Sequence, residues 1–383
     1  MGAIDGPVDL LDGDFYVDDP YGTYAWLRDN EPVVWDQVNE LWGVSRYDDI
    51  VEIEKHKHLF INSDRTKGGY RPNIPADPAI IGLDDPLHSH RRNLVSRRFT
   101  PKAVGKWEDH VRSTVGSLLD DALGHGGPVE IVGELAAPLP AEMIGLLLGF
   151  PEEMFPKLME WSERTITLGG GPRYMDEDGV VAAMEFAQAS ADLYEAKQRC
   201  PADDVISDCL LLLDGGAETT RTVIARGLIE LARRPEQWAL LRDGADLTVA
   251  VEELIRFVTP IHNMCRVATE DTVIGDAQVK AGDQLVLMYS SANRDPAHFE
   301  DPESLDVIRH PNHHLAFGFG THFCLGSSLV RMEIRVFFEE LITRAKRGDL
   351  ANIRQCASHL PTKDSLRSLL RVIRRAIKIA STA

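Results

Sequence analysis

The chain has 383 residues, of which 44% are apolar and 26% charged, so it holds ample material for a buried core and its composition excludes general disorder. Its 41 Lys and Arg against 60 Asp and Glu give a net charge of −19, which argues against a nucleic acid or an anionic membrane as the main partner. Five cysteines at irregular spacing suggest neither a disulfide framework nor a tetrahedral zinc site, so at least one thiol is free for chemistry.

Helical periodicity dominates along the chain. Apolar residues recur every three or four positions in six segments, which predicts helices over 101–123, 140–148, 179–199, 210–232, 247–258 and 325–341. Extended pieces are few and short, at 41–44, 272–274 and 284–288. No internal repeat or linker divides the chain, so we predict a mainly α protein with a minor β part, folded as one domain over residues 1–383.

The start of the chain and its apolar stretches predict the compartment. Residues 1–19 are acidic, whereas a secretory signal is basic and then apolar. No stretch reaches the roughly 20 uninterrupted apolar residues that a bilayer span needs. We therefore expect a cytoplasmic protein that engages neither a membrane nor a nucleic acid.

One cysteine stands in a loop rich in glycine and phenylalanine. Residues 314–326 read H-L-A-F-G-F-G-T-H-F-C-L-G and lead into a predicted helix, with Cys324 at the junction. Free N–H groups and the positive end of a helix dipole lower a thiol's pKa there. Glycines such as Gly326 let the backbone lie flat against a large ligand, while Phe317 and Phe323 can exclude water from the sulfur. A lone cysteine is nevertheless more often structural than reactive.

The loop as a whole matches a known pattern. Its F-G-x-G-x-H-x-C-x-G motif, from Phe317 to Gly326, resembles the haem-binding loop of the cytochrome P-450 superfamily. In that family the cysteine is the axial haem ligand, and its electron donation favours O–O cleavage. The resemblance implies haem b (iron protoporphyrin IX) as cofactor, with Cys324 on the iron and Phe317 and Gly326 against the haem. It also implies the family's fold, a triangular helical prism with the haem between a distal helix and the cysteine loop.

A second segment places an acid and a hydroxyl after two glycines in an otherwise apolar helix, at residues 210–220. Gly215 and Gly216 weaken the hydrogen-bond ladder, and the Thr219 hydroxyl can bond the carbonyl four residues back, which would open the helix at Gly215. A capping or surface-facing pair is the alternative from these residues alone. The segment resembles the family's distal-helix pattern, which implies a haem contact at Gly215 and proton delivery by Glu218 and Thr219.

A third motif is an E-x-x-R pair. Glu253 and Arg256 share a face of a predicted helix, a spacing that is usually a solvated surface pair. It precedes A-N-R-D-P (292–296) and D-P-E-S-L-D-V-I-R (301–309). This order resembles that of the same family, which implies a buried triad of Glu253, Arg256 and Arg309.

Haem carries two propionates, so one edge of its pocket needs cations or hydrogen-bond donors. His88 and Arg92 lie four residues apart and so share a helical face. Arg266 follows a proline turn, and His322 lies two residues before the cysteine. Individually each is more often a surface charge. By the resemblance, all four stand at propionate-binding positions.

The substrate is less well defined by the sequence. N-M-C-R-V (263–267) and the cysteine loop look similar to those of actinobacterial members that hydroxylate sterol side chains, which implies a bulky, mostly apolar molecule, either steroid-like or a macrocyclic natural product. Leu211, Asp214 and His262 stand where relatives line the substrate pocket. We expect Asp214 and His262 to meet a polar group, because an uncompensated carboxylate in an apolar cavity is costly. Asp214 turned to solvent at a frayed helix start is the alternative.

We therefore predict a haem-thiolate monooxygenase that inserts one oxygen atom from O2, with electrons from a ferredoxin and its reductase as in the soluble bacterial members it resembles. Alternatives are a tailoring hydroxylase of secondary metabolism with a partly polar substrate, and a non-catalytic haem-thiolate binding protein. A peroxygenase is disfavoured by the acid and alcohol pair. Because ferredoxins are acidic, we expect a local basic face on the cysteine side. Its candidate residues are Arg91, Arg97, Arg98 and Lys102.

The resemblance runs from about Asp19 to Arg344 and departs from the family in two places. After residues 203–208 the chain enters the distal helix almost at once, where relatives have a further loop. After Arg344 the tail lacks the family's closing hairpin pattern, which puts substrate contacts from the tail in doubt.

Overall fold

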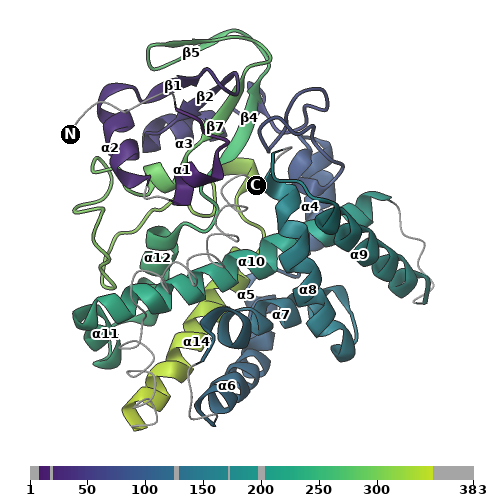
Figure 1. Ribbon diagram of the computed structural model, residues 1–383, viewed down its shortest axis with the longest axis vertical. Coiled ribbons are helices and arrows are strands. Elements are labelled where there is room, and N and C mark those ends of the chain that lie inside the picture. The colour runs from purple at the N-terminus through teal and green to yellow at the C-terminus, as the bar shows by residue number, and fades with distance from the viewer. Residues whose placement is uncertain (1–7, 18–19, 125–128, 171–172, 197–202, 348–383) are drawn as a thin grey trace.

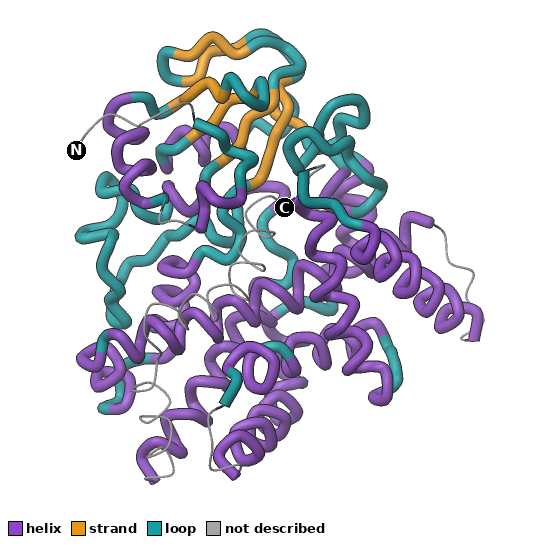
Figure 2. Tube along the Cα trace, in the orientation of Figure 1, coloured by secondary structure: helices purple, strands orange, loops and turns teal. Residues whose placement is uncertain are grey.

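The computed structural model describes residues 8–17, 20–124, 129–170, 173–196 and 203–347. Its strands gather at one end of the molecule together with the first three helices, and the longer helices fill the remainder (Figures 1 and 2). The α-helices are α1 (Gly13–Val17), α2 (Tyr21–Asn30), α3 (Tyr47–Lys55), α4 (Leu87–Ser96), α5 (Pro101–Val104), α6 (Glu108–Gly124), α7 (Pro138–Leu148), α8 (Phe155–Thr165), α9 (Glu177–Ala196), α10 (Asp203–Arg233), α11 (Pro235–Arg242), α12 (Leu247–Val258), α13 (Tyr289–Ala292) and α14 (Ser327–Arg347). The strands are β1 (Val33–Asp36), β2 (Leu41–Val44), β3 (Phe60–Ile61), β4 (Met264–Ala268), β5 (Thr272–Ile274), β6 (Ala277–Val279) and β7 (Gln284–Leu287).

The β part is small, as predicted. Five strands form one sheet in the order β1-β2-β7-β4-β3, and β5 and β6 form a separate antiparallel pair. Only the β2–β7 pairing is parallel within the five-stranded sheet. Apolar residues of α3, among them Ile50 and Ile53, pack with Leu285 and Leu287 of β7. β7 in turn pairs with β4, the strand that carries Arg266, so the sheet fixes α3 close to that strand.

The main core lies among five helices. α10 runs across the middle of the molecule and packs against α7, α12 and α14 (Figure 1). The core includes Val115 and Leu119 of α6, Leu139 and Met143 of α7, Val223 and Ile224 of α10, Leu254 and Ile255 of α12, and Phe337 and Phe338 of α14. Gly216 allows the close approach of α10 to α7, because a Cβ there would lie 2.4 Å from Ile144 Cδ1.

All six predicted helices are present, with three main differences. α14 spans Ser327–Arg347 and so continues six residues past the predicted end. The segment 101–123 is interrupted by a 3-10 turn, Gly105–Trp107, between α5 and α6. α10 begins at Asp203, seven residues before the predicted start, so residues 203–208 are the first turns of the distal helix and not a shortened connection ahead of it.

Three predictions reach beyond the described residues. The last three residues of the helix predicted over 179–199 lie outside them. The atypical tail, 348–383, lies outside them. The single domain over 1–383 includes that tail and stays a prediction.

One stretch within the described ranges, Ile131–Leu148, is long and apolar enough by composition to cross a bilayer, which the sequence analysis did not anticipate. More than half of it is buried. Its Glu142 accepts hydrogen bonds from His110 and Thr114 of α6, at 2.7 and 3.0 Å. Apolar core helices of water-soluble proteins pass the same test of length and composition, so the stretch is weak evidence for a span.

Candidate functional site

The cysteine loop closes on itself at the start of α14. The Cys324 N–H donates to the Phe317 carbonyl at 2.9 Å. Gly318 and Gly320 adopt φ values of 66° and 69°, in the left-handed region that glycine tolerates best. α14 begins at Ser327, so Cys324 stands just outside the helix, where the sequence placed it.

The surroundings of the sulfur differ from the expectation in two respects. Phe317 is buried, and its ring packs 4.5 Å from the Arg331 guanidinium carbon, but Phe323 is 37% exposed. Of these two phenylalanines, only Phe317 is therefore placed to shield the cysteine loop from water. Burial raises the pKa of the Cys324 thiol, and the N–H of Gly326 and the Arg92 guanidinium oppose that shift. The lowered pKa expected at a helix start is overridden by burial in the protein alone.

The four basic side chains predicted for the propionates lie near one another. The His88 and His322 rings are 4.2 Å apart, and Arg92 donates to the Phe323 carbonyl beside the cysteine. The pKa of His322 is lowered to about 2, mainly by burial and then by the nearby Arg266, His88 and Arg92. Like charges depress a histidine pKa in this way, and Asp85 opposes the shift only in part.

The histidines in this cluster have weak partners. The His88 Nδ1 atom lies 3.9 Å from Asp85 Oδ1, and His322 Nε2 lies 4.0 Å from Asp84 Oδ1. His88 is 1% exposed, and neither of its ring nitrogens has a hydrogen-bond partner among the described residues. Buried polar atoms are normally paired, so these nitrogens fit an anionic group brought by a ligand, such as the propionates of haem.

Arg266 already has a carboxylate partner, unlike Arg92, which donates to a backbone carbonyl. Arg266 Nη2 donates to Glu54 Oε1 at 2.6 Å, and both side chains are buried. Its Nη1 donates to the Cys265 carbonyl at 2.8 Å. Glu54 is not among the residues predicted from the sequence, because no local pattern marks it.

The glycine of the distal helix faces open space. A Cβ on Gly215 would meet no atom within 4 Å, and the same is true of Gly326 beside the cysteine. The Thr219 hydroxyl donates to the Gly215 carbonyl at 2.6 Å, as predicted. The helix does not open there, because α10 is continuous from Asp203 to Arg233. The Thr219 hydroxyl therefore adds a hydrogen bond to the Gly215 carbonyl, which keeps its place in the backbone hydrogen bonds of the helix.

Glu218 points away from Thr219, towards α8. Its Oε1 accepts from Ser162 Oγ at 2.7 Å, and its Oε2 is paired with Arg221. Arg221 also binds Glu163 at 2.8 Å, and the Glu163 side chain is 46% exposed. Burial raises the pKa of Glu218, while Arg221 and Ser162 lower it. Glu218 is thus buried but connected to the surface through Arg221. Arg221 lies three residues after Glu218, and this spacing is the signal in the sequence that was missed.

Asp214 and His262 do not meet. Asp214 Oδ1 accepts from Thr165 Oγ1 of α8 at 2.7 Å, and burial raises the Asp214 pKa to about 7. His262 packs against the Tyr16 ring, with 5.5 Å between centroids. Because α10 extends well before it, Asp214 is not at a frayed helix start, so that alternative was wrong. The contact of Asp214 and His262 with a polar group of the substrate stays a prediction. Leu211, one turn before Gly215, is half-buried.

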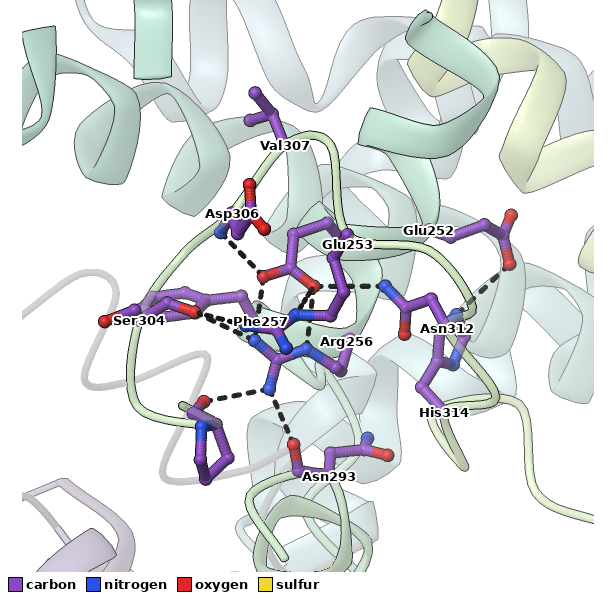
Figure 3. A network of polar contacts seen from close by, with 12 residues as sticks. Glu252, Glu253, Arg256, Phe257, Asn293, Ser304, Asp306, Val307, Asn312 and His314 are labelled. Atoms are coloured by element: carbon purple, nitrogen blue, oxygen red, sulfur yellow. Dashed lines mark hydrogen bonds and ion pairs between the residues drawn. The ribbon is translucent and has the colours of Figure 1, made fainter. Parts of the chain in front are cut away.

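The E-x-x-R triad is confirmed, and Figure 3 shows its network. Arg256 binds both oxygens of Glu253, at 2.7 and 2.8 Å, and both side chains are 0% exposed. Arg309 Nε donates to Glu253 Oε2 at 3.1 Å. Arg256 also donates to the carbonyls of Asn293 and Ser304, at 2.7 and 3.1 Å. The pair therefore holds the loop that leads to the cysteine, and is not a surface bridge.

The predicted basic face is smaller than expected. Arg97, Arg98 and Lys102 are exposed around the junction of α4 and α5. Arg91 is buried, and its guanidinium donates to the Pro78 carbonyl, so it is not part of a docking surface. The α4 periodicity turns Arg91 inward and its neighbours outward.

Comparison with known proteins agrees with this geometry. The family model described as "Cytochrome P450" matches residues 177–346. "Steroid C26-monooxygenase" of Mycobacterium tuberculosis (strain ATCC 25618 / H37Rv) is 38% identical over 360 residues, 88% of this chain and 89% of that protein. "Linalool 8-monooxygenase" of Pseudomonas putida is 32% identical, over 90% of this chain and 93% of its own. The crystal structure of CYP109E1 from Bacillus megaterium with testosterone superposes with a TM-score of 0.77 at 29% identity, covering 86% of this chain and 91% of that one.

These relatives match 86–90% of this chain and 89–93% of their own, and the mainly helical fold of this structure is that of their family. Family members bind haem b, the cofactor that the basic cluster and the open glycines fit. The chain therefore belongs to the cytochrome P-450 family and is a haem-dependent monooxygenase.

Proposed function

We propose that Cys324 is the axial ligand of haem b in this chain and that His88, Arg92, Arg266 and His322 bind the haem propionates. The observation that carries this proposal is the buried His88 ring, whose two nitrogens lack a partner among the described residues. An unpaired buried polar group costs about 1–3 kcal/mol, so a carboxylate arriving with the cofactor relieves a penalty that the protein alone bears.

The protein's own groups define what surrounds the cofactor. Bound haem supplies the activation of O2, favoured by electron donation from the thiolate. Phe317 excludes water beside the sulfur, and the open space at Gly215 and Gly326 leaves room for a flat macrocycle. On α10, Glu218 and Thr219 deliver protons: Glu218 exchanges with solvent near Glu163, and the Thr219 hydroxyl passes the proton on through water.

The substrate class we propose is a steroid-like molecule. The names of the Mycobacterium tuberculosis relative and of the testosterone-bound structure support it. A second candidate, a tailoring hydroxylase with a partly polar substrate, is favoured by Asp214, a carboxylate of α10 whose pKa burial raises to about 7 and whose Oδ1 accepts from Thr165. One set of ligand-binding measurements tests both candidates. Leu211 is the apolar neighbour of Asp214 on α10 and belongs to the same proposed substrate contact. A non-catalytic binder is set aside, because the relatives show a monooxygenase.

Haem spectral shifts measure binding directly. We expect testosterone to shift the haem spectrum at lower concentration than linalool or a macrolide. Asp214→Leu should weaken testosterone binding about tenfold relative to androst-4-en-3-one, which lacks the 17-hydroxyl, because one hydrogen bond to a polar acceptor is lost. Asp214→Asn, which keeps an acceptor of the same shape, is the control.

Two outcomes would contradict these proposals separately. A macrolide that binds while both steroids fail would refute the steroid class. An equal loss of affinity for both steroids in Asp214→Leu would show that Asp214 makes no polar contact with the ligand.

We further propose that a ferredoxin, kept reduced by its reductase, supplies the electrons and docks on the exposed basic face of Arg97, Arg98 and Lys102. An acidic partner is steered by such a face even when the whole protein is acidic. Reversing Arg97→Glu and Arg98→Glu together should slow reduction by ferredoxin about tenfold at low salt and leave ligand binding unchanged. Lys280→Glu, an exposed charge reversal beside the β5–β6 pair, is the control. Equal reduction rates in stopped-flow measurements would remove this face from consideration.

A further inference from the structure

Glu54 is a buried carboxylate that the proposed mechanism does not use. It lies in the last turn of α3, and its side chain is 1% exposed. Its Oε1 accepts from Arg266 Nη2 at 2.6 Å and from the Tyr289 hydroxyl at 2.8 Å. Its Oε2 is buried and has no hydrogen-bond partner among the described residues. A buried carboxylate with one idle oxygen is costly, so its retention needs an explanation.

The position of Glu54 ties it to the cysteine loop. A Cβ on Gly318 would lie 3.6 Å from both Glu54 Oε1 and the Tyr289 hydroxyl, and a Cβ on Gly320 would lie 2.7 Å from the Glu54 carbonyl oxygen. The loop therefore rests directly on the end of α3. Figure 1 shows α3 beside β7 and β4, the strand that carries Arg266.

Arg266 stands between Glu54 and the basic cluster. Its positive charge lowers the pKa of His322, so it is close to that ring as well as to Glu54. A guanidinium has five N–H donors, and the contacts to Glu54 and to the Cys265 carbonyl leave others for a second carboxylate. One arginine can thus serve two carboxylates at once.

We propose that Glu54 is a positioning residue that shares Arg266 with a haem propionate and thereby lowers the haem reduction potential. The inference rests on the proposed function, because it takes Arg266 as a propionate partner. Reduction of ferric haem adds a negative charge to the site. The buried Glu54 carboxylate repels the added negative charge. By pairing with Arg266 it also neutralises the guanidinium charge that would otherwise favour reduction.

Glu54→Gln tests this charge with little change of shape. We expect the reduction potential, measured by spectroelectrochemical titration of the haem protein, to rise, and the rate of the first electron transfer to rise with it. Glu52→Gln is the matched control: Glu52 lies on the same helix but its side chain is 63% exposed, so solvent screens its charge and the potential should not move.

Glu54→Asp is a second variant, to be used if the Glu54→Gln protein does not fold. It keeps the charge but draws it away from Arg266, so we expect a rise of the same sign and smaller size. A potential equal to that of the wild type in whichever of these variants binds haem would overturn the inference. That result would leave the proposed function standing, because haem content and the carbon monoxide spectrum of the same samples report on Cys324 independently.

Discussion

Replacing Cys324 with serine is expected to abolish monooxygenase turnover while the protein still folds. The hydroxyl of serine is not ionised at neutral pH and is a hard ligand, so it cannot replace the electron donation of a thiolate. The fold should survive, because the loop is closed by the Cys324 N–H bond to the Phe317 carbonyl, which does not involve the sulfur. The reduced protein should lose the red-shifted carbon monoxide band of thiolate-bound haem.

The control for this experiment is Cys209→Ala. Cys209 is also buried, but it lies in α10 and packs with Phe186 and Leu213, away from the loop. This variant should keep the carbon monoxide band and lose only a little thermal stability, as expected for a small cavity. A Cys324→Ser protein with an unchanged band would refute the ligand assignment, whatever its activity.

Local patterns explain why the main features could be predicted from the sequence. The helix over 247–258 has the predicted bounds, since its apolar stripe and its partners lie within a few residues of one another. The tight turn before α14 follows from glycines in one short segment, where Gly318 and Gly320 adopt positive φ. The bond from Thr219 to the Gly215 carbonyl is likewise a contact four residues apart.

Contacts between distant segments explain most of what was missed. Arg266 and Glu54 are 212 residues apart, and Thr165 and Asp214 are 49 apart, so no spacing rule pairs them. Whether Arg91 points inward depends on which face of α4 meets the preceding loop, which the helix itself does not specify. The pKa of Cys324 shows the same limit: a helix start lowers it, but burial, a property of the whole fold, raises it more.

The second large effect concerns proton delivery. Glu218→Gln is expected to reduce turnover about 100-fold or more, in the range typical for loss of a general acid, with ligand binding unchanged. Glutamine can still accept from Ser162, but it cannot carry a proton between solvent and the active site. Thr219→Ala removes the next hydroxyl on α10, so electrons should be consumed with less product and more hydrogen peroxide.

The pH dependence should separate this role from a structural one. Burial raises the pKa of Glu218 against the opposing charge of Arg221, while the neighbouring Glu163 raises it further. An acid acts in its protonated form, so the wild-type rate should fall as pH rises through this raised pKa, later than for an ordinary glutamate. The glutamine variant has no proton to lose, and its low rate should not follow that decline.

Glu160→Gln serves as the control, because it removes a half-exposed carboxylate of α8 that pairs with Lys157 and Arg164. It should leave both the rate and its pH profile in place. Steady-state turnover, peroxide yield and the pH profile of the three variants together decide the question. If the glutamine variant kept the wild-type decline with pH, another group would carry the proton, and Glu218 would only brace α10 against α8 through Ser162.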